Sequence, residues 1–361
     1  MKSPMNPLWL LLLTLCLFAV GEIVFILINA TATSTKTLEA MPYEKGQGVQ
    51  SATPISSETL LDISGKQLLP AYIDLSIGGH LRIRRNGGED ILLQVKEVVA
   101  ESTSKTAPRS RVLFDINGKT IEAYCGMLYP DHSGIGPVDV DGIRINVEIT
   151  KIVFSRISWK KTFNSYTAFR LTKDVRLAIW DPSQPIMATA LGVFVVDQPA
   201  WTRQRYGNWL HRTNYGIHSA IDIFATTSGV PEKVISPVDG VSYCYHKDAL
   251  PDSETIMKHV NIYSSAEVGP HKEKILFRFL HLSRILVKNG EHVRKGQVIG
   301  YTGHTGFKAY IGDHLHFEIR LNPSLLGMEF DDNIMASIPV NPYPFLLEWW
   351  KNNDGYHAES N

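Results

Sequence analysis

Strict alternation of polar and apolar residues from His314 to Ile319 is the feature that most restricts how this chain can fold. Successive side chains of a β-strand point to opposite faces of the sheet. The polar residues His314, His316 and Glu318 therefore share one face, and the apolar residues between them share the other. The segment predicts a strand that buries one face in a core and presents two imidazoles and a carboxylate on the opposite face.

A second polar pair lies earlier in the chain, where His218 and Asp222 are four residues apart. Two histidines on a strand face are by themselves more often a solvated surface than a metal site. Two imidazoles and a carboxylate together are a donor set that suits zinc, with one position left for water. The combination of the two segments therefore indicates a metal centre more strongly than either segment does alone.

Four motifs between about Tyr206 and Leu347 resemble the lysostaphin/LytM-type zinc metallopeptidases, which are peptidoglycan endopeptidases with a C-terminal antiparallel β-sheet domain. The motifs recur in the family's order, and the strand and turn at 236–241 also resemble the family. They are an HxxxD segment at 218–222, a histidine segment at 279–283, a glycine-punctuated run at 293–306 and the HLHFE segment at 314–318.

The resemblance implies a zinc-dependent endopeptidase that hydrolyses amide bonds in peptidoglycan peptides. His218, Asp222 and His316 would bind zinc, and water would complete the tetrahedron. His281 and His314 would remain unmetallated as catalytic residues, one taking a proton from the zinc-bound water and the other steadying the oxyanion. The chain has no HExxH segment, so the resemblance provides no glutamate base of that kind.

Four departures from the family pattern leave the five histidine and aspartate positions intact. Ala220 replaces the glycine of an HxGxD motif, and Phe279 stands where tyrosine is common. The segments 265–274 and 307–311 are longer than expected. Glu318 either orients a ligand imidazole or is exposed to solvent, and Arg212 and Tyr215 are weaker candidates to line the site.

The N-terminus predicts export and attachment to a membrane. Residues 8–28 are almost all apolar, and about 20 such residues cross a bilayer. We expect a transmembrane segment within 1–30, a stalk over 31–60 and an extracytoplasmic catalytic domain in a single-pass protein of the cell membrane. Secretion after cleavage is the alternative, because 19–21 and 30–32 both resemble signal cleavage sites.

The middle region, 61–200, predicts an all-β accessory domain. A hairpin is expected from 80–84 and 91–95 around Asn86-Gly87-Gly88, with further strands at 111–114, 121–127, 143–154 and 175–180. Asp131, His132, Asp139 and Asp141 could form a metal loop, but solvated turn residues are the favoured interpretation. The peptidase domain would occupy 201–350, with a terminal helix at 345–351 and a loose tail at 351–361.

The balance of charged residues argues against nucleic acid as a partner. The chain has equal numbers of basic and acidic residues, 36 of each, so it lacks the basic excess typical of nucleic-acid binding. Cys125 and Cys244 are more consistent with buried single thiols than with a disulfide.

Two other functions stay open: a non-catalytic regulator of cell-wall amidases, and a protease of a protein substrate. The sequence predicts no oligomeric state.

Overall fold

The computed structural model describes residues 59–65, 69–102, 108–126, 136–157, 171–184, 206–213, 216–224, 230–268, 272–306, 312–322 and 337–346. The predicted membrane segment, the tail at 351–361 and nearly all of the predicted stalk lie outside these residues, as does the predicted boundary near residue 200. The described helices include none that is long and apolar enough to cross a membrane. Thr59 and Leu60, placed in the stalk from the sequence, belong to a strand.

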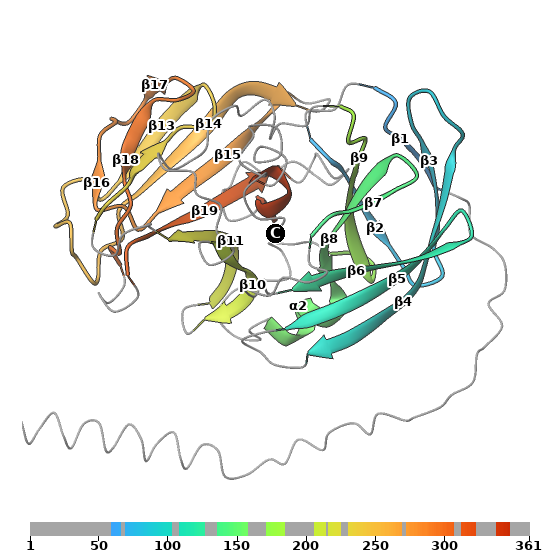
Figure 1. Ribbon diagram of the computed structural model, residues 1–361. Helices are drawn as coiled ribbons and strands as arrows, with labels where there is room; N and C mark the ends of the chain where they lie inside the picture. The colour runs from blue at the N-terminus through green and yellow to red at the C-terminus, as the bar shows by residue number, and fades with distance from the viewer. Residues whose placement is uncertain are drawn as a thin grey trace, which may run out of the picture. The chain divides into compact units, whose positions relative to one another are not determined.

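A five-stranded sheet forms the first part of the middle region, in the order β1-β3-β4-β5-β6 (Figure 1). Its strands are β1 (Thr59–Asp62), β3 (His80–Arg84), β4 (Ile91–Ser102), β5 (Arg109–Ile116) and β6 (Lys119–Gly126). The predicted hairpin is confirmed, because His80 pairs with Gln94 and Ile83 with Ile91 in antiparallel register. Alternation explains its stability: Leu81 and Ile83 are buried while their polar neighbours face solvent.

A second sheet of four strands packs against the first through a shared core. It is ordered β2-β9-β8-β7, from β2 (Ala71–Leu75), β9 (Val175–Trp180), β8 (Ile143–Thr150) and β7 (Val138–Val140). All residues of β8 and β9 are buried, including the polar side chains that alternate with apolar ones along β8. Cys125 is buried and Cys244 is half-buried, and both are free thiols.

The prediction of an uninterrupted strand at 143–154 was wrong, because β8 ends at Thr150 and helix α2 follows at Lys151–Ile157. The Thr150 hydroxyl accepts a hydrogen bond from the Val153 backbone N–H at 3.2 Å, which is the geometry of a helix N-cap. The β-branched residues at 152 and 153 concealed this start in the sequence. Val153 and Phe154 still reach the core.

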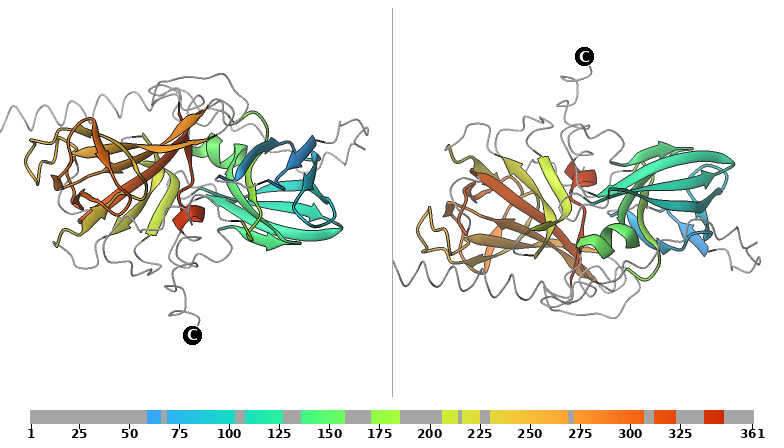
Figure 2. Two further views of the ribbon diagram at one scale, coloured as in Figure 1. Left: turned by 90° about the horizontal axis from the view of Figure 1, so that it is seen from above. Right: turned by 90° about the horizontal axis from the view of Figure 1, so that it is seen from below.

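An eight-stranded sheet carries the C-terminal motifs, in the order β10-β11-β19-β15-β14-β13-β17, with β20 paired to β19. Figure 2 shows these strands grouped together in both views. Their bounds are β10 (Tyr206–Thr213), β11 (Gly216–Phe224), β13 (Gly240–Tyr245), β14 (His259–Val268), β15 (Glu273–Leu280), β17 (Glu291–Val293), β19 (His314–Leu321) and β20 (Ile338–Val340). The mainly β prediction is confirmed, and the described part of segment 265–274 extends the β14–β15 hairpin.

The glycine-punctuated run builds a three-stranded sheet, β12-β18-β16, beside the larger one. The strands are β12 (Lys233–Ile235), β18 (Val298–Tyr301) and β16 (Arg284–Ile285). A side chain at Gly303 would lie 2.6 Å from the Ser283 backbone nitrogen, so only glycine permits this close approach. Gly296 has a φ of 84°, a conformation that other residues adopt at a cost.

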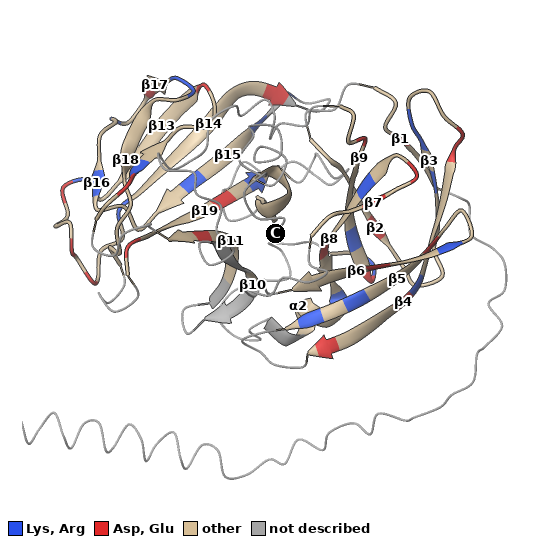
Figure 3. Ribbon diagram, in the orientation of Figure 1, with Lys and Arg blue, Asp and Glu red and all other residues tan. Residues whose placement is uncertain are grey.

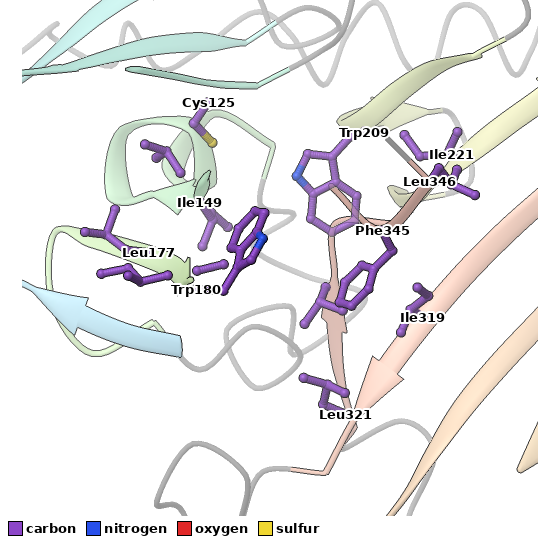
Figure 4. Close-up of a cluster of buried hydrophobic side chains, with 14 of the residues drawn as sticks. Cys125, Ile149, Leu177, Trp180, Trp209, Ile221, Ile319, Leu321, Phe345 and Leu346 are labelled. Atoms are coloured by element: carbon purple, nitrogen blue, oxygen red, sulfur yellow. The ribbon is translucent and has the colours of Figure 1, made fainter. Parts of the chain in front are cut away.

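Buried groups from the middle region meet the C-terminal strands around Trp209 and Phe345 (Figure 4). The Trp209 indole N–H donates to the Glu148 backbone carbonyl at 3.2 Å, and the Asn341 backbone N–H donates to the Glu148 carboxyl at 2.8 Å. Asn341 immediately follows β20. A helical turn occupies 343–346, two residues earlier than the predicted helix start. Burial raises the pKa of Glu148 to about 7, despite hydrogen bonds from Asn341 and Asn146 and the charge of Arg176.

Glu148→Gln is expected to flatten part of the pH dependence of stability. The folded chain binds the Glu148 proton more tightly than the unfolded chain does, so wild type loses stability as pH rises from 4.5, the usual value, to about 7. At about 1.4 kcal/mol per pKa unit, that loss is on the order of 3 kcal/mol. Urea unfolding at pH 4.5 and pH 7.5 measures it. The exposed control Glu97→Gln should keep the wild-type slope, and an unchanged slope in Glu148→Gln would contradict this prediction.

Candidate metal centre

His218, Asp222 and His316 converge because β11 and β19 are neighbours in the large sheet. Asp222 lies directly opposite His316 in the antiparallel register, and His218 is four residues before Asp222 on β11. Core residues fix this alignment, since Ile221, Ile223, Leu315 and Phe317 are fully buried on the other face. The polar face of β19 follows from the alternation in its sequence, but its meeting with β11 is a tertiary contact.

The three side chains form a compact donor set. One ligand atom from each lies within 4.8 Å of the other two. His218 Nε2 is 3.0 Å from Asp222 Oδ1, and His316 Nδ1 is 3.4 Å from the same oxygen. The two imidazole centroids are 4.6 Å apart. These separations resemble those between neighbouring ligands around one zinc ion, for which ligand bonds are about 2.0–2.2 Å.

The electrostatics of the set also fit a cation. Asp222 is buried, yet the neighbouring His218 and His316 hold its pKa well below the usual range against the effect of burial. Although burial opposes it, the carboxylates of Asp222 and Glu318 raise the pKa of His316 to about 9. A buried carboxylate among imidazoles therefore stabilises positive charge at this position. Nitrogen and carboxylate donors with this spacing fit zinc.

Glu318 is buried rather than exposed, which decides between the two roles left open by the sequence. Its Oε1 lies 3.0 Å from His316 Nε2 and accepts a hydrogen bond from the Nε2–H, which directs Nδ1 toward Asp222. Its Oε2 accepts hydrogen bonds from Arg278 at 2.8 Å and from Arg320 at 2.7 Å. Despite burial, these two arginines hold the Glu318 pKa well below its usual range. Such a carboxylate fixes the orientation of a ligand imidazole.

His281 and His314 lie beside the donor set. The His281 ring centroid is 5.0 Å from that of His314 and 5.4 Å from that of His316. His281 immediately follows β15 and has a φ of 66°. This left-handed conformation is uncommon for a residue with a side chain and often marks a functional site.

Backbone carbonyls fix the tautomers of both rings. His281 Nδ1 is 2.8 Å from the Thr305 carbonyl, and His314 Nδ1 is 3.0 Å from the Gly312 carbonyl. A carbonyl oxygen only accepts hydrogen bonds, so each Nδ1 carries the proton and each Nε2 keeps a lone pair. Burial lowers the pKa of both rings, well below the usual value for His281. Both are therefore neutral bases near pH 7.

The structure brings together all five residues singled out in the sequence as metal ligands or catalytic groups. Their functional roles stay predictions. The side chains of Arg212 and Tyr215 lie outside the described residues. Arg278 was missed, although a charged residue between two phenylalanines on a strand was a signal. His304, which had no predicted role, pairs through Nδ1 with Asp313 at 2.7 Å.

The acidic residues of the middle region behave as surface groups where they are described. Asp139 pairs with Arg144, and Asp141 pairs with Lys119 and Asn117. Asp131 and His132 lie outside the described residues. Within the described part of the chain, His218, Asp222 and His316 are the group of side chains with the spacing of a metal site.

Comparisons with known proteins agree with the motifs. Residues 216–327 match the family model described as Peptidase family M23. The chain is 34% identical over 125 residues to the peptidoglycan DD-endopeptidase ShyB of Vibrio cholerae, covering 34% of this chain and 25% of ShyB. It is 28% identical over 141 residues to lysostaphin of Staphylococcus staphylolyticus, covering 39% of this chain and 24% of lysostaphin.

A solved structure also matches, that of the catalytic domain of lysostaphin from Staphylococcus simulans. The match has 23% identity, covers 44% of this chain and 97% of that chain, and has a TM-score of 0.27. This chain spans about a quarter of the length of ShyB and lysostaphin. The predicted resemblance to the lysostaphin/LytM-type peptidases is confirmed for the C-terminal segment.

His316→Ala is expected to abolish stoichiometric zinc binding, because it removes one of the three predicted ligands and the group that Glu318 orients. Zinc in the purified full chain, measured by inductively coupled plasma mass spectrometry, should fall from about one equivalent to near zero. The control His292→Ala, a histidine on β17 outside the cluster, should keep the wild-type zinc content. Full zinc in His316→Ala would remove that residue from the ligand set.

Proposed function

Residues 216–327 form a domain of peptidase family M23, and on that premise we propose that this chain is a zinc-dependent endopeptidase. Its substrate class would be peptidoglycan peptides, whose amide bonds it would hydrolyse. The observation that carries the proposal is the buried His218, Asp222 and His316 cluster with two neutral imidazoles beside it. The peptidoglycan endopeptidases among the relatives support the substrate class.

His218 Nε2, Asp222 and His316 Nδ1 would hold the zinc ion. When bound, zinc lowers the pKa of a water molecule toward neutrality and polarises a carbonyl group. Glu318 accepts a hydrogen bond from the His316 Nε2–H, so Nδ1 is the ring nitrogen that would bind the metal.

His281 and His314 would move the protons of the reaction. Each presents Nε2 as a base, since Nδ1 donates to a backbone carbonyl. One ring would take a proton from the attacking water and later deliver it to the leaving amine, while the other would steady the developing oxyanion. Protonating a buried imidazole becomes less costly as negative charge develops beside it. Each ring can therefore start neutral and take up a proton during the reaction.

The N-terminal segment would place this activity outside the cytoplasm. We propose that residues 1–30 anchor the chain in the cell membrane as a single-pass segment and that 31–58 is a linker. Secretion after signal cleavage is the second location consistent with the sequence. The middle β region would be an accessory domain attached to the peptidase strands, since Glu148 accepts a hydrogen bond from Asn341 after β20.

Two alternative functions can be distinguished from the proposed one. A non-catalytic regulator of amidases does not require the complete set of ligands and bases, whereas this chain has His281 and His314 as well as the metal cluster. A protease of a protein substrate would use the same centre, and the identity of the cleaved polymer separates it from a wall hydrolase.

Digestion of purified peptidoglycan by the full chain tests the proposed function. Zinc-loaded protein is expected to release fragments with new amino termini, identified by mass spectrometry, and a chelator should abolish their release. Zinc restored after chelation should recover it. Zinc-loaded protein that cleaves no peptidoglycan peptide would contradict the proposed substrate class, and cleavage unaffected by metal removal would contradict the mechanism.

His281→Ala is expected to keep zinc and lose turnover. Removal of a positioned acid or base typically costs about 10²–10⁴-fold in rate, so kcat should fall in that range while metal content stays near one equivalent. His292→Ala is the matched control and should retain wild-type kcat. A His281→Ala protein with unimpaired kcat would exclude this side chain from proton transfer.

A further inference from the structure

The face of the large sheet that carries the metal centre continues over three further strands. Asp222 on β11 is opposite His316 on β19, which is opposite Leu280 on β15. Leu280 is opposite His259 on β14, which is opposite Tyr245 on β13. Residues directly opposite each other in a sheet share a face, so the metal centre and Tyr245 lie on the same surface. Figure 1 shows the strands β11, β19, β15, β14 and β13 that carry these residues.

A row of polar contacts runs along this face, away from the metal centre. Glu318 contacts His316 and accepts a hydrogen bond from Arg278, whose Nε lies 3.3 Å from the Asn261 side-chain oxygen. Asn261 is directly opposite Tyr243 on β13. Figure 3 shows the charged positions on β15 and β19. The row links the centre to β13 through side chains that hydrogen-bond to one another, with Asn261 and Glu318 buried and the Arg278 side chain 16% exposed.

An aromatic cluster lies at the far end of the row. The rings of Tyr245 and His259 stack in parallel at 4.2 Å, and those of Tyr243 and Tyr263 meet edge to face at 5.6 Å. Tyr243 is 43% exposed and Tyr245 is 39% exposed, although both are large aromatic residues on a strand. Their inner partners, His259 and Tyr263, are half-buried. The cluster is therefore held by its inner rings and presents its outer rings to solvent.

The distance from the cluster to the metal centre suits a short peptide. Three strand spacings separate β19 from β13, about 14 Å at about 4.8 Å each. An extended chain rises about 3.3 Å per residue, so about four residues bridge the two positions. Peptides that branch from the glycan strands of peptidoglycan are of this short kind. A scissile bond at the centre would place the sugar end of such a peptide near Tyr243 and Tyr245.

Resting on the proposed function, we propose that Tyr243 and Tyr245 form a carbohydrate-binding subsite. They would hold an amino-sugar ring of the glycan strand, with the attached peptide extending from the two tyrosines toward its scissile bond at the metal centre. Exposed tyrosines combine a flat apolar ring with a hydroxyl. This combination matches a sugar, which has an apolar face of C–H groups and a rim of hydroxyl and amide groups.

Paired substrates test the subsite. One is a cross-linked peptide that carries its disaccharides, and the other is the same peptide after an amidase has removed the sugars. The zinc-loaded full chain is expected to have a KM about tenfold lower for the sugar-bearing substrate, the contribution of two aromatic contacts. The Tyr243→Ala/Tyr245→Ala double variant should lose this preference through a higher KM for the sugar-bearing substrate only, with kcat unchanged.

Three further variants separate stacking from general effects. Tyr245→Trp keeps a flat ring and should retain the preference, whereas Tyr245→Leu should weaken it. Leu250→Ala removes an exposed apolar side chain elsewhere, 70% exposed, and should behave as wild type. Equal KM values for the two substrates in wild type, or equal loss on both substrates in the double variant, would overturn the subsite. If the double variant does not fold, Tyr245→Leu decides by the same comparison.

Direct binding distinguishes failure of the subsite from failure of the proposed function. Calorimetric titration of the full chain with the disaccharide-peptide requires no turnover. If wild type cleaves neither substrate but binds the sugar-bearing fragment about tenfold more tightly than the double variant does, the proposed activity fails and the subsite stands. If binding is independent of both tyrosines, the subsite fails whatever the activity.

Discussion

The alternation of β19 is the constraint on which both the C-terminal core and the metal centre depend. Leu315, Phe317 and Ile319 are fully buried on one face, and the opposite face holds His314, His316 and Glu318. Burial of each large apolar side chain contributes about 1.5–3 kcal/mol, so a one-residue slip would cost several kcal/mol and would also turn the imidazoles into the core. The hydrophobic core therefore fixes the donors in place.

The surroundings of this strand give each histidine a different state. Glu318, held by Arg278 and Arg320, orients His316 and favours its positive charge. The carbonyls at 305 and 312 fix the tautomers of His281 and His314, and burial keeps both rings neutral. One cluster thus contains an imidazole whose carboxylate neighbours favour positive charge, carried by a proton or by a bound cation, and two imidazoles suited to accept a proton. Residue type is the same in all three, and the difference comes from their hydrogen-bond partners.

The middle region is connected to the same sheet through buried groups rather than through strand pairing. Trp209, on β10, donates to the Glu148 carbonyl, and the Glu148 carboxyl accepts from Asn341 after β20. Both contacts join β8 to segments next to the strands that carry the metal centre. Because burial favours the protonated Glu148 even though the Asn341 hydrogen bond favours the carboxylate, the fold is more stable below neutral pH than above it.

The sequence by itself determined which residues share a face along the polar row of β19 and in the hairpin at 80–95, because alternation gives that directly. The motifs that resemble the lysostaphin/LytM-type peptidases identified the five candidate site residues. Only the tertiary structure decided which rows meet. No local pattern encodes the pairing of strands that are distant in sequence. This pairing sets the register of β11 on β19, the burial of Glu318 and the row of opposed residues from His316 to Tyr245. Helix α2 shows the same limit locally, because a threonine cap and long-range burial overrode the β-branched residues that favour a strand.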